Sequence, residues 1–191
     1  CIADEVMTGF GRTGKLFASH YLQKQPDIFC LSKGLTGGFL PMGVTTCTSA
    51  IFDAFWSDDK RKMFFHGHSF TANPLGCAAA LASLDLLLQP DCQQNIQRIA
   101  ASHQSFKEKL SSHPKVREIR YTGTVLAVEF KTSEDTSYFN NIRDRLYHFF
   151  INKGVLLRPL GNLIYVLPPY CITEEQLGRV YDVMEEALEL L

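Results

Sequence analysis

The sequence lacks the features that mark several large classes of protein. Its formal net charge is only −1 and its basic residues are scattered, so nothing favours nucleic acid or an anionic membrane surface as a partner. No uninterrupted apolar run approaches the ~18 residues that a membrane-spanning helix needs. The six cysteines form no C-x-x-C pair, so we expect reduced thiols packed in a core rather than a disulfide framework or a zinc site.

The chain also lacks an initiator methionine. Residues 1–6 already have the composition of a strand in the middle of a sheet, and a natural domain seldom starts there. We therefore expect that residues upstream are missing, together with any targeting segment. We also expect that this chain alone has an incomplete active site, binds a cofactor weakly or not at all, and is inactive.

What the sequence does contain is a series of short apolar runs separated by loops and helical segments. Residues 1–6, 28–31 and 42–47 are such runs, and the pattern predicts an α/β fold with a mostly parallel sheet of buried strands. Asn73-Pro74 predicts a helix start, with asparagine as N-cap and proline in the first turn. This helix is expected to end near residue 88, and its many small residues permit close packing.

A second domain is predicted from the change of pattern near residue 85. Residues 1–85 are expected to belong to one domain, and residues 86–191 to a small α+β domain. The elements expected in the second part are helices at 93–110 and 138–152, strands at 120–130, 155–158 and 163–167, and a last helix opened by a capping box at Thr173 and Gln176. The apolar face of the helix at 93–110 is predicted to contain Ile96, Ile99, Ala100, His103, Phe106 and Leu110.

Two short motifs suggest sites that the rest of the sequence does not support. Residues 9–15 fit the G-x-x-x-x-G-K pattern of nucleotide hydrolases, but Leu16 stands where a serine or threonine must hold magnesium. Irregular sequence follows where that motif requires a helix. Residues 66–68 form an H-x-H pair, but no further ligands are evident, so no metal site is expected.

Two polar residues that follow neighbouring apolar runs indicate another chemistry. Asp4 and Lys33 are 33 − 4 = 29 residues apart, and each lies at the end of a predicted strand. A carboxylate there could keep the ring nitrogen of pyridoxal phosphate protonated, and a lysine could bond to the aldehyde of that cofactor. The spacing alone leaves open that Lys33 is a solvated loop lysine.

Longer stretches favour the first interpretation by resemblance. Residues 3–14, 26–38 and 66–74 resemble, in order and spacing, the signature blocks of the class III aminotransferases, a family of fold-type-I pyridoxal-phosphate enzymes. The resemblance covers essentially the whole chain. It implies the C-terminal part of the large cofactor-binding domain, followed by the small C-terminal domain.

The resemblance also implies roles for five residues. Lys33 corresponds to the lysine that forms the Schiff base with pyridoxal phosphate and carries the proton in the reaction, and Asp4 corresponds to the partner of the ring nitrogen. Ser69 corresponds to the residue that binds the cofactor phosphate across the dimer interface. Arg158 corresponds to the arginine that binds the substrate carboxylate, and Tyr165 is expected to line the pocket.

A structural role is the alternative for several of these residues. Arg158 could be an exposed strand arginine, Ser69 could cap a turn, and Tyr165 could serve packing. Glu5 is expected to be a hydrogen-bonding, structural carboxylate.

Within the family, residues 64–79 and 157–170 most resemble the members that serve biotin synthesis. The resemblance implies transfer of an amino group from S-adenosylmethionine to 8-amino-7-oxononanoate, giving 7,8-diaminononanoate, in a homodimer. We expect a cytoplasmic protein, or an organellar one in a eukaryote. The alternatives are another class III enzyme for ornithine, 4-aminobutyrate or general amines, an aminomutase or decarboxylase, and an inert homologue that serves as a dimerisation module.

Overall fold

The computed structural model describes residues 1–191 and divides them into two compact units. The first unit is Cys1–Gln93 and the second is Gln94–Leu191. The division lies within the long helix α3 (Pro90–Leu110), whereas the sequence places the change of domain near residue 85. Each unit is described by itself.

The first unit is built on a three-stranded sheet in the order β1-β2-β3. The strands are β1 (Ile2–Asp4), β2 (Ile28–Leu31) and β3 (Val44–Cys47). β1 and β2 are parallel, with Asp4 opposite Cys30, but β2 and β3 are antiparallel. The α/β class is confirmed, but within this chain the sheet is mixed rather than mostly parallel. The link from β2 to β3 is too short to hold a crossover helix, and antiparallel pairing needs none.

The strands of this sheet are less buried than the sequence predicts. Ile2 on the edge strand β1 is 67% exposed, and all of β2 is half-buried. The prediction of core cysteines is also wrong. All six are free, with Cys1, Cys47 and Cys171 exposed and the other three half-buried. Apolar composition predicts the strands correctly, but it does not predict which faces of the sheet are buried by other segments.

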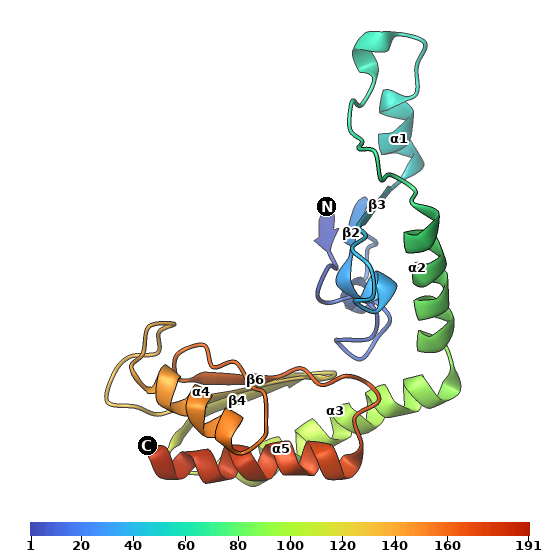
Figure 1. The fold of residues 1–191 in the computed structure, drawn as a ribbon. Coiled ribbons are helices and arrows are strands. Elements are labelled where there is room, and N and C mark those ends of the chain that lie inside the picture. Colours follow the sequence, from blue (N-terminus) through green and yellow to red (C-terminus); the bar gives the residue numbers. More distant parts are fainter. The chain divides into compact units, whose positions relative to one another are not determined.

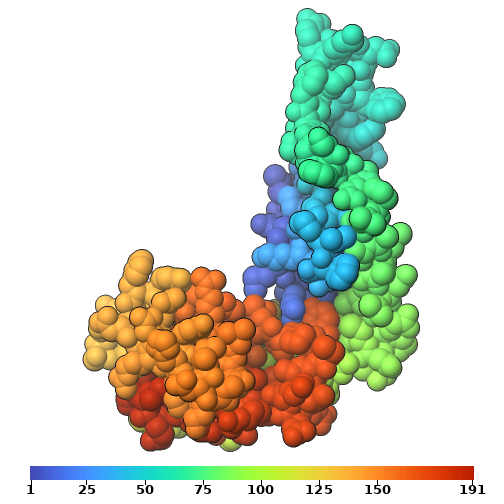
Figure 2. All heavy atoms as spheres, viewed as in Figure 1, coloured from blue at the N-terminus to red at the C-terminus, as the bar shows by residue number.

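An arm and a helix follow the sheet of the first unit. The arm contains helix α1 (Ser49–Phe55) and the short 3₁₀ helix η3 (Lys60–Lys62), and it stands out from the sheet (Figures 1 and 2). Helix α2 (Pro74–Leu87) then runs back beside the sheet (Figure 1). Its predicted start is confirmed, because the Asn73 side chain accepts a hydrogen bond from the Leu75 N–H at 3.0 Å.

The second unit is an antiparallel sheet packed against helices. The sheet order is β4-β5-β6, formed by β4 (Val116–Thr122), β5 (Val125–Phe130) and β6 (Leu163–Val166). The helices are α3, α4 (Ile142–Asn152) and α5 (Glu174–Glu186), followed by the 3₁₀ turn η4 (Ala187–Leu190). The predicted capping box is present, with Thr173 and Gln176 bonding each other's backbone N–H.

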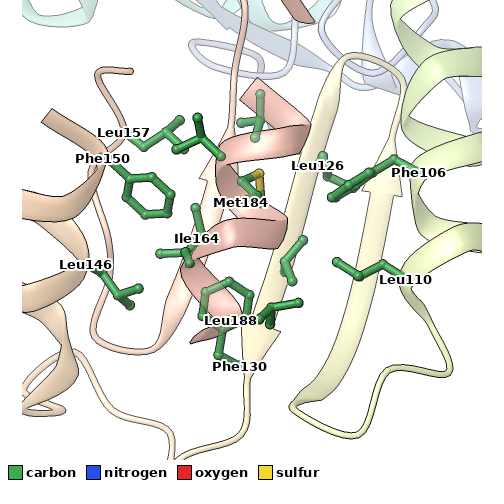
Figure 3. Close-up of a cluster of buried hydrophobic side chains, with 14 of the residues drawn as sticks. Phe106, Leu110, Leu126, Phe130, Leu146, Phe150, Leu157, Ile164, Met184 and Leu188 are labelled. Carbon is green, nitrogen blue, oxygen red and sulfur yellow. The ribbon is translucent and has the colours of Figure 1, made fainter. Parts of the chain in front are cut away.

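The core of the second unit joins all of these elements (Figure 3). Phe106 and Leu110 of α3 face Leu126 of β5, while Met184 of α5 lies over the sheet. The predicted face of α3 is confirmed for five of its members, which are the buried residues Ile96, Ile99, His103, Phe106 and Leu110. Ala100 is half-buried. Helical periodicity alone therefore identifies this core surface.

Three predicted elements of this unit differ from the structure. The single strand expected at 120–130 is a hairpin, because Gly123 turns the chain with φ +54°. The helix expected from residue 138 begins at Ile142, and residues 155–158 form no strand. Only a bridge between Leu160 and Leu163 precedes β6.

No single helix of the structure is long and apolar enough to cross a membrane. Helices α2 and α3 reach the length and apolar composition of a membrane span only if the two are counted together across the break between them.

Candidate functional site

Asp4 and Lys33 lie at the same edge of the first sheet. β1 and β2 are parallel neighbours, and Lys33 follows Cys30, the register partner of Asp4, by 33 − 30 = 3 residues. The Asp4 carboxylate accepts a hydrogen bond from the Val6 N–H at 3.0 Å, which fixes one of its oxygens. Lys33 is exposed, and its amine forms no ion pair or hydrogen bond in the structure. A free amine and an oriented carboxylate therefore stand at adjacent strand ends.

The backbone of Lys33 has an unusual conformation. Lys33 begins the 3₁₀ turn η2 (Lys33–Thr36) with φ +43°, in the left-handed region that non-glycine residues rarely occupy. Hydroxyl groups close the loop around it. Ser32 Oγ donates to the Met42 carbonyl at 2.7 Å, and Thr36 Oγ1 donates to the Leu40 carbonyl at 2.6 Å. The loop therefore holds a strained lysine in one place.

Glu5, beside Asp4, organises the loop that follows β1. It is 2% exposed, and one carboxylate oxygen accepts from the Ser19 N–H at 2.7 Å. The other oxygen accepts from Thr8 Oγ1 at 2.5 Å and from the Ala18 N–H at 3.1 Å. Burial alone would raise the pKa of Glu5, but these hydrogen bonds together hold it below the ordinary value. The expected structural role of Glu5 is confirmed.

Ser69 lies in the arm of the first unit, in the turn that precedes α2. It is exposed, and the structure gives its hydroxyl no contact with Lys33 or Asp4. The turn is closed by its neighbours, since the His68 N–H donates to Thr71 Oγ1 at 3.1 Å. The structure therefore brings Asp4 and Lys33 together but leaves Ser69 apart from them, on the arm.

Arg158 and Tyr165 belong to the second unit. Tyr165 is half-buried on β6, opposite Ala127 of β5. Arg158 is exposed, and its guanidinium donates to the Tyr138 hydroxyl at 3.4 Å. That bond, with the nearby charge of Tyr138 and then of Tyr165, raises the pKa of Arg158. Arg158 also lowers the pKa of Tyr138, with a smaller contribution from Arg143.

Tyr138 is the residue of this group that the sequence did not indicate. It lies in the loop between β5 and α4, which packs against the turn before β6. A Cβ added to Gly161, which has φ +65°, would lie only 1.7 Å from the Ser137 carbonyl oxygen. Asn162, which is 1% exposed, donates to Thr136 Oγ1 at 3.2 Å. No periodicity or spacing links Tyr138 to Arg158, because the contact depends on this packing of two loops.

The second unit also contains a hollow between two of its helices. It has a volume of about 510 Å³ and is formed by α3 and α5 of the second unit. Its lining carries both signs of charge, including Arg98, Lys109, Glu174 and Asp182. None of the residues predicted for the site contributes to it.

The comparison with known families decides the family. The profile of the class III aminotransferases matches residues 1–188. The chain belongs to this family. The match includes both strand ends that carry Asp4 and Lys33, and it extends through the second unit to η4.

Sequence relatives support the same family, and those described here share one enzyme name. The adenosylmethionine-8-amino-7-oxononanoate aminotransferase of Synechococcus elongatus is 50% identical over 188 residues, which are 98% of this chain and 44% of that protein. The enzyme of the same name from Geobacter sulfurreducens is 40% identical over 98% of this chain and 42% of that protein. The chain therefore spans less than half the length of the curated relatives it matches.

Solved structures agree on the fold across different activities. The crystal structure of adenosylmethionine-8-amino-7-oxononanoate aminotransferase from Methanocaldococcus jannaschii is similar with a TM-score of 0.89 and 36% identity, over 98% of this chain and 45% of that one. An omega-transferase from Vibrio fluvialis gives a TM-score of 0.84 and 29% identity, over 98% and 45% of the two chains. The fold-type-I assignment is confirmed, but a shared fold does not select a substrate.

Proposed function

We propose that the protein carrying this sequence is a pyridoxal-phosphate-dependent aminotransferase that uses S-adenosylmethionine to aminate 8-amino-7-oxononanoate. The observation that carries the proposal is the placement of Asp4 and Lys33 at the carboxyl ends of the adjacent parallel strands β1 and β2. The names of relatives up to 50% identical support the choice of reaction.

The residues at the sheet edge fit the proposed cofactor. Pyridoxal phosphate, when bound, supplies an aldehyde and an aromatic ring that withdraws electrons from a bonded carbon. The unpaired amine of Lys33 would serve as the nucleophile toward the aldehyde and as the base for the α-carbon proton of the amino donor. Asp4, with one oxygen fixed by the Val6 N–H, has its second oxygen available to hold a proton on the ring nitrogen.

The remaining predicted residues supply recognition. Arg158 offers a guanidinium for the carboxylate of the oxononanoate chain, a pairing that is bidentate and persists at all physiological pH values. Tyr165 lies near enough to Arg158 to contribute to its raised pKa, which supports a place beside the same substrate group. Ser69 supplies a hydroxyl for the cofactor phosphate.

A second copy of the chain is the proposed partner. The arm that carries Ser69 exposes large aromatic side chains, including Trp56 at 75% and Phe65 at 81%. Apolar groups at this density on a projecting segment are typical of protein interfaces. Ser69 would then act in the site of the neighbouring copy. Sedimentation velocity of the wild type and of Phe65→Ser tests the partner, and an unchanged monomer in both would contradict it.

The first experiment locates the reactive lysine. Because this chain alone is expected to have an incomplete active site, residues 1–188 first replace the matching part of the Synechococcus elongatus relative. This chimera is incubated with pyridoxal phosphate, reduced with borohydride and mapped by peptide mass. We expect preferential modification of Lys33 over Lys131, which is an exposed lysine in the second unit. Equal modification of the two lysines would contradict the proposed attachment site.

The second experiment tests the reaction. Residues 1–188 replace the matching part of the Synechococcus elongatus relative, which the chain matches over 188 residues. We expect this chimera to aminate 8-amino-7-oxononanoate with S-adenosylmethionine. Lys33→Ala should reduce turnover by about 10²–10⁴-fold, because a positioned general base contributes that much, whereas Lys131→Ala should not.

The same assay separates the alternatives. Activity with ornithine, 4-aminobutyrate or simple amines but not with 8-amino-7-oxononanoate would indicate another class III enzyme. Product without an acceptor would indicate an aminomutase or decarboxylase. A folded chimera without any activity would favour an inert homologue.

A further inference from the structure

Gly34, the residue after Lys33, is enclosed by side chains from two distant segments. On one side lies Phe10, because a Cβ added to Gly34 would stand 2.9 Å from the Cβ of Phe10 and 2.9 Å from its Cδ2. On the other side lies Ser83 of α2, whose hydroxyl donates to the Gly34 carbonyl at 3.2 Å. Gly34 is therefore required by the close approach of Phe10, whatever its own backbone conformation.

These contacts fix the peptide group between Gly34 and Leu35, which directly follows the peptide group that joins Lys33 to Gly34. The Gly34 carbonyl accepts from the Gly37 N–H at 3.1 Å as well as from Ser83. A Cβ added to Gly37 would lie 3.3 Å from Ser83 Oγ, so the same hydroxyl also borders the end of the turn. A lysine with φ +43° costs free energy, and such a conformation persists only where its surroundings determine it.

Helix α2 is well placed to act on this loop. Gly76 and Ser83 are seven residues apart and lie on one face of the helix. A Cβ at Gly76 would meet Met42 Sδ at 3.4 Å, and the Met42 carbonyl accepts the hydrogen bond from Ser32. The helix therefore contacts both the start and the end of the loop that carries Lys33.

We propose that Ser83 and Phe10 are positioning residues for Lys33, holding Gly34 between them so that the lysine keeps its left-handed backbone and its amine keeps its direction. This inference rests on the proposed function of Lys33. Neither residue touches the reacting atoms. Ser83 acts through its hydrogen bond to the Gly34 carbonyl. Phe10 acts by packing against Gly34, which keeps Gly34 from shifting.

The test measures the reactivity of Lys33 in the chimera of residues 1–188 with the Synechococcus elongatus relative. The probe is pyridoxal phosphate followed by borohydride, and the readout is modification of Lys33 divided by modification of Lys131 in the same molecules. The variants are Ser83→Ala, Ser83→Thr, which keeps the hydroxyl, and Phe10→Ala, which removes the ring that lies against Gly34. Ser105→Ala on α3 is the matched control, because Ser105 is an exposed helical serine.

We expect Ser83→Ala to lower the ratio about fivefold, the equivalent of one ordinary hydrogen bond. Ser83→Thr should restore it, Phe10→Ala should lower it, and Ser105→Ala should leave it at the wild-type value. Circular dichroism is recorded for each variant, so that a loss of fold is not taken for a loss of positioning.

Two failures are distinguishable. If wild-type Lys33 is no more reactive than Lys131, the proposed function fails. If wild-type Lys33 is selectively modified but Ser83→Ala keeps the wild-type ratio, the positioning role is overturned while the function stands. A low ratio in Ser83→Ala that Ser83→Thr does not raise would also overturn it, because the hydroxyl would then not be the cause.

Discussion

Replacing Glu5 with glutamine tests how the loop beside Asp4 is held. The carboxylate accepts from Ser19 and Ala18 N–H groups through different oxygens, with Thr8 sharing the second. A glutamine amide has only one accepting oxygen, so in either orientation its NH₂ group must face a backbone N–H. At least one charge-assisted hydrogen bond is lost, which costs about 2 kcal/mol at a buried site.

The assay is hydrogen exchange of the Ala18 and Ser19 amides, measured by mass spectrometry. A loss of about 2 kcal/mol predicts exchange roughly 30-fold faster in Glu5→Gln than in the wild type. Glu118→Gln is the matched control, because Glu118 is an exposed carboxylate in the second unit, paired with Arg120 at 3.2 Å. It should leave both amides unchanged.

The pH dependence gives a second check on Glu5. Its folded pKa lies below the ordinary 4.5, so the carboxylate stabilises the loop above that pH and loses this effect as pH falls through the folded pKa. The difference between wild type and Glu5→Gln should therefore shrink below pH 4.5. Equal protection of both amides in the two proteins at neutral pH would refute the argument.

Two further predictions concern the second unit. Gly161→Ala should destabilise it by more than about 3 kcal/mol in urea unfolding, because the added Cβ would overlap the Ser137 carbonyl. Gly178→Ala on α5 is the control and should be neutral or stabilising, because open space surrounds that position. Similar free-energy changes for the two variants would contradict this account. Burial lowers the pKa of His103 to about 4 against its ordinary 6.5, so stability is full above 6.5 and is lost as pH falls toward 4. Between pH 7 and pH 5 the unit should lose about 2 kcal/mol, and His103→Gln should remove most of this dependence of the melting temperature.

Features with a local signal could be predicted from the sequence. Asn73 before Pro74 marked a helix start, and Thr173 with Gln176 marked a capping box, because a cap needs only residues a few positions apart. Asp4 ends one apolar run and Lys33 follows another, but only the family resemblance distinguishes Lys33 from a solvated loop lysine. The parallel pairing of β1 and β2 then placed them at one edge.

Features that depend on contacts between distant segments could not be predicted. Ser83 bonds to Gly34 across 49 residues, and Tyr138 bonds to Arg158 across 20. No periodic pattern encodes either pair. The hairpin at Gly123 was missed for a related reason, since the apolar pattern runs on through the turn. A glycine within such a run is compatible with either a continuous strand or a reversal.

At the position of Lys33, the residue that the proposed chemistry requires differs from the residue that would give the most stable fold. Glycine would adopt φ +43° freely, so Lys33→Gly should make the fold more stable by roughly 1 kcal/mol while removing the amine. A protein that had only to dimerise would have no use for a lysine there. An inert scaffold would gain stability by replacing this strained lysine.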